Sequence, residues 1–231
     1  MTVAEQILAF NDQLYLDDSL LPDGISVMNP FRGEHAPSID KVTRAFYEAF
    51  YNDHQPRHLI LGINPGRFGA GVTGVPFTDT KRMRDVCRID VPIDPTHEPS
   101  SVFVYKVVDA FGGPSPFYSR FYINSVCPLG FTRLNEKGNE VNYNYYDDRR
   151  LQQAVTPFIV RCIERQLSFC QNSDRCFCMG RGKNFAYLNT LNKKHRWFDA
   201  VIPLDHPRFV VQYRSRRMEE YVKAYSDALG K

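Results

Sequence analysis

The sequence predicts an α/β fold in which a parallel sheet carries helices on both faces. Four short apolar runs alternate with segments of helical periodicity, and this alternation is typical of parallel strands joined by right-handed crossovers. The 231 residues suffice for one domain, and no linker, internal repeat or low-complexity tract divides them. The hydrophobic fraction of 43% and the charged fraction of 24% are those of an ordinary globular protein. We therefore expect one domain spanning residues 1–231.

The first two helices are predicted from caps and from apolar residues at helical spacing. Thr2 and Glu5 form a capping box in front of an amphipathic segment that ends near Leu16. Prolines and glycines make residues 17–37 irregular. Ser38 is the expected N-cap of a second helix. Its apolar face consists of Val42, Ala45, Phe46, Ala49 and Phe50.

The most informative stretch is the apolar run His58–Ile63, which a glycine-rich loop follows. The run predicts a buried central strand, and Pro65 next to Gly66 predicts a sharp turn at its end. Four glycines within nine residues cost conformational entropy, which indicates that bare backbone is needed there. Ligands of open α/β sheets bind beyond the carboxyl ends of the strands, where this loop would lie. The alternative is a plain glycine-rich surface loop.

The remaining elements follow from the same two periodicities. Three more strands are predicted at residues 121–126, 175–179 and 197–203, and a hairpin at 131–141. Further helices are predicted at residues 80–88, 102–111, 148–169 and 180–191, with a last one capped by Ser215. Pro157 predicts either a kink in the longest helix or a fresh start capped by Thr156. The prolines of residues 89–100 predict a surface excursion.

Four stretches between positions 59 and 207 form an ordered set. The first is Gly62-Ile63-Asn64-Pro65-Gly66-Arg67-Phe68-Gly69, with Thr73-Gly74-Val75-Pro76-Phe77 shortly after it. The others are Asn124–Leu129, Gly180–Ala186 and His206–Pro207. In type and order these stretches resemble the motifs of the single-strand-selective monofunctional uracil-DNA glycosylases, a branch of the uracil-DNA glycosylase superfamily. The resemblance implies a three-layer sandwich around a central four-stranded parallel sheet.

The resemblance also implies an activity: hydrolytic release of flipped-out uracil from DNA in base excision repair, without a metal or organic cofactor. Cleavage of the bond between base and sugar puts positive charge on the sugar and negative charge on the base. The implied catalytic residues are His206, which stabilises the anionic base, and Asn64, which positions a water. An amide cannot take a proton, so we expect a largely dissociative mechanism. The implied base-binding residues are Ile63, Gly66, Phe68, Phe77 and Asn124.

Several alternatives stay open at this point. Asp79 and Asp205 are carboxylates near the motifs and could act as a base, although capping or a solvated surface position is simpler. Asn124 could cap its strand instead of binding a base. The small residues Ala70 and Gly71 leave room beside the pyrimidine C5, so substituted uracils, or a purine lesion such as xanthine, are open as substrates. The rival function is a non-catalytic nucleotide- or nucleic-acid-binding α/β protein that retains the pocket.

DNA, single- or double-stranded and containing uracil, is the expected partner. The net charge of +3 permits binding through a local basic patch. After His206–Pro207 the family usually continues Ser-Pro-Arg-Asn-Pro, whereas this chain has Arg208–Arg214, so Phe209 or Tyr213 is the candidate wedge between bases. A solvated basic surface is the alternative. The candidate phosphate contacts are Arg208, Arg214, Arg216 and Arg217, with Arg181 and Lys183 at a second site.

Six cysteines are predicted to be buried free thiols. The paired spacing of zinc sites and the ligand spacing of iron–sulfur relatives are both missing, and Cys176 and Cys178 in a strand would point to opposite faces. No apolar run approaches the length of a membrane span, and the N-terminus lacks a signal-peptide pattern. We expect a monomer in the cytoplasm, in a prokaryote the bacterial cytoplasm or nucleoid.

Overall fold

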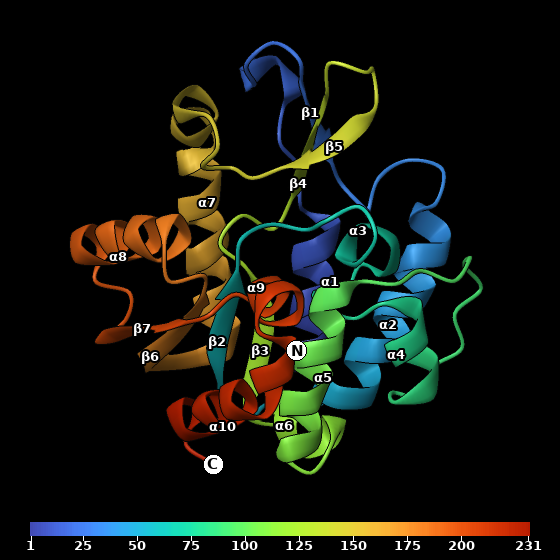
Figure 1. Cartoon of the computed structure of the whole chain (residues 1–231), viewed down its shortest axis with the longest axis vertical. Helices are drawn as coiled ribbons and strands as arrows, with labels where there is room; N and C mark the ends of the chain where they lie inside the picture. The colour runs from blue at the N-terminus through green and yellow to red at the C-terminus, as the bar shows by residue number, and fades with distance from the viewer.

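The centre of the computed structural model, which describes residues 1–231, is a four-stranded parallel sheet in the order β3–β2–β6–β7. β2 (Arg57–Gly62) lies between β3 (Phe121–Ser125) and β6 (Gln171–Met179), and β7 (Ala200–Leu204) forms one edge. All three pairings are parallel, so the four carboxyl ends lie at the same edge (Figure 1). The predicted fold class and the central position of the His58–Ile63 run are confirmed.

Helices cover both faces of this sheet. In Figure 1, α5, α9 and α10 lie in front of the sheet, whereas α1 and α7 lie behind it, with α7 contacting β2 and β6. The helices are α1 (Val3–Asp12), α2 (Ala36–Tyr51), α3 (Ala70–Thr73), α4 (Thr80–Asp85), α5 (Pro99–Ala110), α6 (Pro114–Tyr118), α7 (Arg149–Cys170), α8 (Lys183–His195), α9 (Pro207–Tyr213) and α10 (Met218–Leu229). None of them combines the length and apolar composition that crossing a membrane requires.

A second, antiparallel sheet of three strands stands over the carboxyl edge of the first. Its strands are β1 (Ile25–Met28), β4 (Gly130–Leu134) and β5 (Glu140–Tyr143), in the order β1–β4–β5. The hairpin β4–β5 is the one predicted from the sequence, whereas β1 was missed because its four residues lie among prolines and glycines. A Cβ at Gly130 would come within 2.7 Å of the Pro65 carbonyl oxygen, so glycine lets this sheet approach the loop after β2.

Four local predictions need correction. α1 ends at Asp12 instead of near Leu16, although its capping box is present. α2 begins at Ala36 with His35 as N-cap, because Pro37 is tolerated in a first turn, so Ser38 is not the cap. α7 runs unbroken past Pro157, which rules out a fresh start at Thr156. Ser215 opens a 3₁₀ turn, Ser215–Arg217, and Arg217 is the N-cap of α10.

The core is a single cluster of 57 buried apolar residues that joins both faces of the parallel sheet. All six cysteines are buried and unbonded, as predicted. Arg57 is fully buried at the start of β2, where its guanidinium binds Asp53 at 2.8 Å and its Nε donates to the Tyr118 carbonyl at 2.7 Å. A buried charge with these partners is satisfied, and it fixes the amino end of the strand that leads to the glycine-rich loop.

Candidate active site

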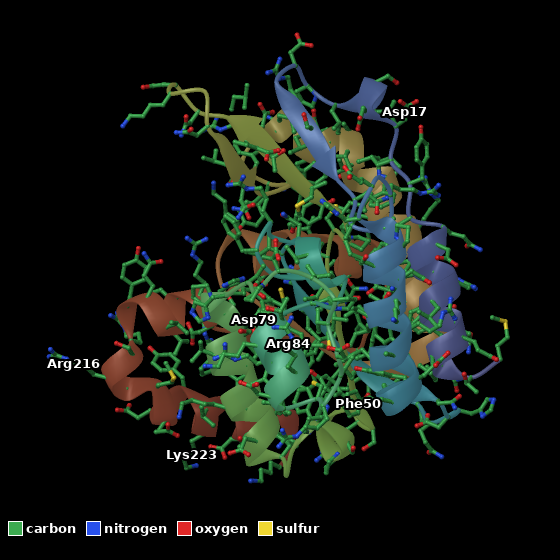
Figure 2. All side chains as sticks on the ribbon, turned by 90° about the vertical axis from the view of Figure 1, so that its right-hand side faces the viewer. Asp17, Phe50, Asp79, Arg84, Arg216 and Lys223 are labelled. Carbon is green, nitrogen blue, oxygen red and sulfur yellow. The ribbon has the colours of Figure 1, made fainter.

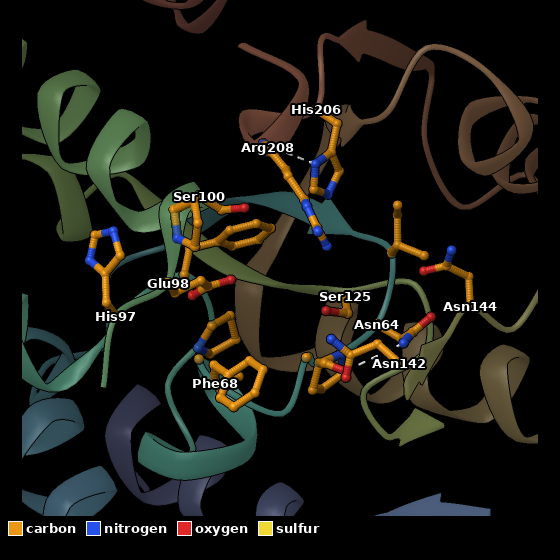
Figure 3. A pocket seen from close by; sticks show the side chains of 18 residues that line it. Asn64, Phe68, His97, Glu98, Ser100, Ser125, Asn142, Asn144, His206 and Arg208 are labelled. Carbon is orange, nitrogen blue, oxygen red and sulfur yellow. Dashed lines mark hydrogen bonds between the residues drawn. The ribbon is translucent and has the colours of Figure 1, made fainter. Parts of the chain in front are cut away.

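A cavity of about 520 Å³ opens at the carboxyl edge of the parallel sheet. Its walls come from the loop after β2, the start of α5, the end of β3, the strand β5 and the start of α9 (Figure 3). Segments far apart in the sequence therefore meet where parallel strands end, which is where ligands of α/β sheets bind. Of the predicted base-binding residues, Ile63, Gly66, Phe68 and Phe77 line this cavity.

Phe77 forms a buried apolar plate in the cavity wall. A Cβ at Gly62 would lie 2.8 Å from Phe77 Cζ, so only glycine at the end of β2 lets the ring pack there. Phe77 itself has φ of 55°, a left-handed conformation that costs about 1–3 kcal/mol for a bulky residue. Its ring is 8% exposed and its centroid lies 6.1 Å from that of His206. The strained backbone conformation of Phe77 thus places the flat face of its ring beside His206.

Asn64 is held in one orientation by backbone partners at the end of β5 and just after it. Its Oδ1 accepts the Tyr145 N–H at 3.1 Å, and its Nδ2 donates to the Tyr143 carbonyl at 3.2 Å. These partners fix which end of the amide is oxygen. Asn64 lines the cavity, and its Oδ1 keeps one lone pair free for a water. The same bonds give Asn64 a structural part, because they join the loop to the hairpin.

His206 is the N-cap of α9, and this determines its tautomer. Its Nδ1 accepts the backbone N–H of Arg208 at 3.2 Å, so in the neutral ring the proton sits on Nε2. The Nε2 side of the ring faces the cavity in Figure 3. Burial, with a further contribution from the Arg208 guanidinium, lowers the pKa of His206 to about 4. At neutral pH His206 is therefore an uncharged hydrogen-bond donor directed at the cavity.

Glu98 lines the cavity, although it was not among the predicted site residues. The loop that carries it was predicted to be a surface excursion, but Asp79 draws the Glu98 backbone inward by accepting its N–H at 3.0 Å. Glu98 Oε2 is buried and has no hydrogen-bond partner. Burial raises the pKa of Glu98 to about 7, with the Asp79 carboxylate contributing and Arg208 opposing. An acidic residue before Pro99 looked like a plain helix start, so no local signal marked it.

The two aspartates considered as bases are structural. Asp79 is fully buried, caps α4 by accepting the Arg82 N–H at 2.9 Å, and also accepts from Ser101 Oγ at 2.8 Å. Asp205 pairs with Arg181, whose Nε lies 3.0 Å from its Oδ2. Neither aspartate lines the cavity. Capping and surface pairing are thus their roles in this structure.

Asn124 does not lie where it was predicted. It does not line the cavity; it lines a small neighbouring hollow of about 10 Å³, and Ser125 lines the cavity in its place. Adjacent residues of a strand point to opposite faces, which explains the exchange. Asn124 Nδ2 donates to the Tyr122 hydroxyl at 2.7 Å and its Oδ1 accepts the Ser125 N–H at 2.8 Å. The hollow and the cavity share a wall formed by Pro65, Ala70 and Pro76.

Two asparagines of the hairpin were missed by the sequence analysis. Asn142 and Asn144 alternate along β5 and its end, so both reach the cavity. Asn142 Oδ1 accepts the Arg67 N–H at 3.1 Å, and Asn144 Nδ2 donates to Asp147 at 2.9 Å. The period-two spacing was visible in the sequence, but nothing there indicated that the hairpin faces the loop after β2.

The glycine turn before α8, which carries the candidate phosphate contacts Arg181 and Lys183, also positions Asn184. Buried Asn184 donates through Nδ2 to the Gly62 carbonyl at 3.2 Å and accepts at Oδ1 from the Tyr145 hydroxyl at 2.7 Å. It therefore ties the end of β2 to the hairpin. Arg181 is occupied by Asp205, and Lys183 lies over the Tyr146 ring with Nζ 5.8 Å from its centroid.

The basic segment after His206 divides into distinct parts. Arg208 lines the cavity, and Arg217 is bound by Glu220 at 2.6 Å. Arg216 has neither an ion pair nor a side-chain hydrogen bond, and Figure 2 shows it projecting from the molecule. Phe209 and Tyr213 are exposed at 36% and 61%, with ring centroids 5.8 Å apart. The Arg214 guanidinium carbon lies 5.1 Å from the Phe209 ring centroid. This aromatic pair with Arg214 and Arg216 forms one exposed surface.

Comparison with known proteins bears on this geometry. The model of the family described as the uracil DNA glycosylase superfamily matches residues 48–230. The chain belongs to this superfamily. The matched region includes every strand of the parallel sheet and each cavity wall described above.

Two superfamily members show how near the likeness is. A crystal structure of wild-type SMUG2 from Pedobacter heparinus is 46% identical, with a TM-score of 0.95 over 99% of this chain and 97% of that one. The mouse protein named single-strand selective monofunctional uracil DNA glycosylase is 28% identical over 144 residues, which cover 55% of this chain and 49% of the mouse protein. The chain thus spans about half the length of this curated relative. The family resemblance stated from the sequence motifs is confirmed.

Proposed function

We propose that this protein is a monofunctional DNA glycosylase that hydrolyses the bond between uracil and deoxyribose in DNA. The observation that carries the proposal is the geometry of His206, a neutral ring whose Nε2–H faces a cavity beside the Phe77 plate. A base stacked on Phe77 would present a carbonyl oxygen to this donor. Membership of the superfamily and the likeness to SMUG2 support the same activity.

His206 would act on the leaving base. Negative charge develops on the uracil oxygens as the bond breaks, and a fixed donor in a water-poor site stabilises this charge strongly. A neutral imidazole suits this task because its donor is already in place and no proton has to be taken up first. The backbone N–H of Arg208 keeps the proton on Nε2 throughout. His206 would therefore lower the barrier by leaving-group stabilisation.

Asn64 would hold the attacking water and Asn124 would read the base edge. The free lone pair of Asn64 Oδ1 can accept from a water in the cavity, while the Tyr145 N–H keeps the amide in place. Each end of the Asn124 amide also keeps one bonding position, a second hydrogen and a second lone pair, which match the O4 and N3–H of uracil. The base would have to widen the hollow past Pro65 and Pro76 to reach it.

The exposed surface of Phe209, Tyr213, Arg214 and Arg216 would contact DNA beside the flipped nucleotide. An aromatic side chain can fill the gap that an extruded base leaves in a duplex, and the arginines can contact phosphates. Tyr213, Arg214 and Arg216 also border a hollow of about 330 Å³ between Gln212 and Arg217. We further propose, on the sequence alone, that the protein acts as a cytoplasmic monomer; size-exclusion chromatography with light scattering tests the monomer.

One assay tests the proposed activity. The protein is incubated with an oligonucleotide that contains a single uracil, and alkali then breaks the strand at any abasic site. Strand breaks only after alkali treatment are expected, because a monofunctional enzyme leaves the sugar–phosphate chain intact. Tight binding of the same oligonucleotide without abasic sites would favour a non-catalytic binding protein instead. Oligonucleotides with hydroxymethyluracil or xanthine in the same position define the lesion range.

A further inference from the structure

Glu98 is the only carboxyl-bearing residue among those that line the cavity, and the roles assigned above leave it without a function. Its position is fixed from behind. Asp79 Oδ2 accepts the Glu98 N–H at 3.0 Å and the Ser101 hydroxyl at 2.8 Å, so a buried carboxylate anchors the turn that starts α5. Figure 3 shows the Glu98 side chain directed into the cavity. The turn is therefore built to present this group.

One oxygen of the Glu98 carboxyl, Oε2, is buried without a partner. It makes no hydrogen bond, although a buried polar atom in this state normally costs about 1–3 kcal/mol. The loop after β2 makes room for it, because a Cβ at Gly69 would overlap the carboxyl group. The sequence indicated that bare backbone is needed in this loop, and at Gly69 it is needed to make room for the Glu98 carboxyl group. Oε2 lies against Gly69, whereas Oε1 is not buried and accepts no hydrogen bond, so Oε1 is the carboxyl oxygen open to a ligand in the cavity.

The charges around Glu98 keep it close to half-ionised at neutral pH. Burial and the Asp79 carboxylate raise its pKa to about 7, while the Arg208 guanidinium on α9 lowers it. The other titratable or charged groups nearby are His97 in the same loop, His206 across the cavity and Arg82, whose guanidinium binds Asp79 at 3.0 Å. Proton transfer is most efficient when the pKa of the transferring group lies near the working pH.

Glu98 lies at the depth expected for the sugar. Its chain neighbours His97 and Pro99 are exposed, and Phe68, also on the cavity wall, is 57% exposed. At the deep end Phe77 and Ser125 are 8% and 3% exposed. A flipped base enters first, whereas its sugar stays attached to the DNA backbone at the mouth. The mouth side of the cavity, where Glu98 lies, is therefore nearer to the sugar than to the base.

The other buried polar groups of the cavity cannot take a proton at neutral pH. The Asn64 amide is not basic, and His206 already has its Nδ1 occupied and its proton on Nε2. His97 lies on the exposed rim, where its Nδ1 is 3.6 Å from Asp79 Oδ2. We propose that the Glu98 carboxylate is the catalytic base that accepts the proton of the attacking water. This proposal rests on the proposed glycosylase function.

The step balances with the groups present. The C1′–N1 bond breaks with its electron pair going to the base, whose oxygen receives the His206 hydrogen bond. The water oxygen held by Asn64 then forms a bond to C1′, and one of its protons moves to a Glu98 oxygen. The proton then passes from Glu98 to the released anionic base, directly or through solvent, so the products are neutral base and an abasic sugar. A carboxylate at this place also stabilises the positive charge that develops on the sugar.

The test is the pH profile of single-turnover uracil release by wild type, E98Q and E219Q between pH 5 and 9. The wild-type rate is expected to rise with pH through about 7, because the ionised carboxylate is the active form. E98Q is expected to be slower by about 10²–10³-fold and to lose this rise. E219Q is the matched control, since Glu219 on α10 forms an exposed ion pair with Lys106 of α5, outside the cavity. Unfolding temperatures confirm that each variant is folded.

Chemical rescue separates a catalytic from a structural role. E98A opens space where formate can bind, and added formate is expected to raise its rate at least about tenfold, with no effect on wild type. A rate within threefold of wild type for E98Q, a rise through pH 7 that persists in E98Q, or no rescue of E98A would each overturn the role of Glu98. If wild type itself releases no uracil, the proposed function fails instead, so the two failures are distinguishable.

Discussion

The Nδ1 atom of His206 accepts the backbone N–H of Arg208 at 3.2 Å, and this bond settles which nitrogen faces the cavity as a donor. The bond exists because α9 begins at Pro207, whose missing N–H leaves the next amide as the first to be capped. The position of Pro207 in the sequence therefore determines where α9 starts, and the start of α9 determines the tautomer of His206. The lowered pKa of His206 also keeps Nδ1 unprotonated, because the ring stays neutral well below pH 7.

Asn64→Ala should slow uracil release and also destabilise the fold. The change removes an acceptor from the Tyr145 N–H and a donor from the Tyr143 carbonyl, which leaves two backbone groups unpaired at a cost of about 1–3 kcal/mol. Urea unfolding measures the stability and single-turnover cleavage measures the rate. A slow variant with wild-type stability would mean that the loop does not depend on these bonds.

Asn64→Asp should not raise activity, although it places a carboxylate where the wild-type amide cannot take a proton. The second carboxylate oxygen would face the Tyr143 carbonyl, where the wild-type amide donates. This repulsion disfavours the charged form or moves the hairpin. We expect a rate below wild type across pH 5 to 9. A variant faster than wild type at pH 8 would show that residue 64 can act as a base.

Asn124→Asp tests whether this residue reads the base. A carboxylate accepts from the cytosine amino group but repels the uracil O4, so the variant should lose uracil release and gain weak cytosine release. The Tyr122 hydroxyl and the Ser125 N–H can both bind the new carboxylate, so the fold should tolerate it. Competition between uracil and cytosine oligonucleotides provides the measurement. Full uracil activity would leave Asn124 with a structural role only.

Arg214 and Arg216 should account for part of the salt dependence of DNA binding, whereas Arg217 should not. Neutralising the first two should reduce the slope of log K against log salt by about one to two. Arg217→Ala is the matched control, because its guanidinium is held by Glu220 at 2.6 Å. Fluorescence anisotropy at several salt concentrations gives the slopes. Equal slopes for the double variant and wild type would place the phosphate contacts elsewhere.

Glu98→Gln should stabilise the protein more at pH 8 than at pH 5. The native carboxyl keeps its proton up to about 7, against 4.5 for the free group, so its contribution is present below pH 4.5 and lost as pH rises through 7. The difference amounts to at most about 3 kcal/mol. Urea unfolding of the variant and wild type at both pH values measures it. If variant and wild type differ in free energy of unfolding by the same amount at pH 5 and pH 8, the pKa of Glu98 is not raised.

The fold could be predicted because its signals are local. The apolar run of β2, the glycine-rich loop and the helical stripes each appear within a short window, and the alternation of strands and helices then places all strand ends together. Asn64, Phe77 and His206 were found for this reason. Each of the three residues belongs to a sequence motif that lies at the carboxyl edge of the sheet.

The missed residues depend on contacts between distant segments. Glu98 reaches the cavity because Asp79, nineteen positions earlier, accepts its N–H. Asn142 and Asn144 reach it because Asn64 binds the backbone after β5 and Gly130 packs against Pro65. Asn124 was predicted to face the cavity, whereas its neighbour Ser125 lies on the side of the strand that faces it. Such pairings are set by packing, which no window of the sequence contains.

The most direct test of the central claim is single-turnover uracil release by wild type and His206→Ala at pH 7.5, with His54→Ala as an exposed control. We expect release by wild type and by the control, and a loss of about 10²-fold or more for His206→Ala with DNA binding retained. Because His206 stays neutral over this range, its titration should not contribute to the pH profile near pH 6.5. The profiles of wild type and His206→Ala should therefore have the same shape there. Wild-type rates in His206→Ala would contradict the account.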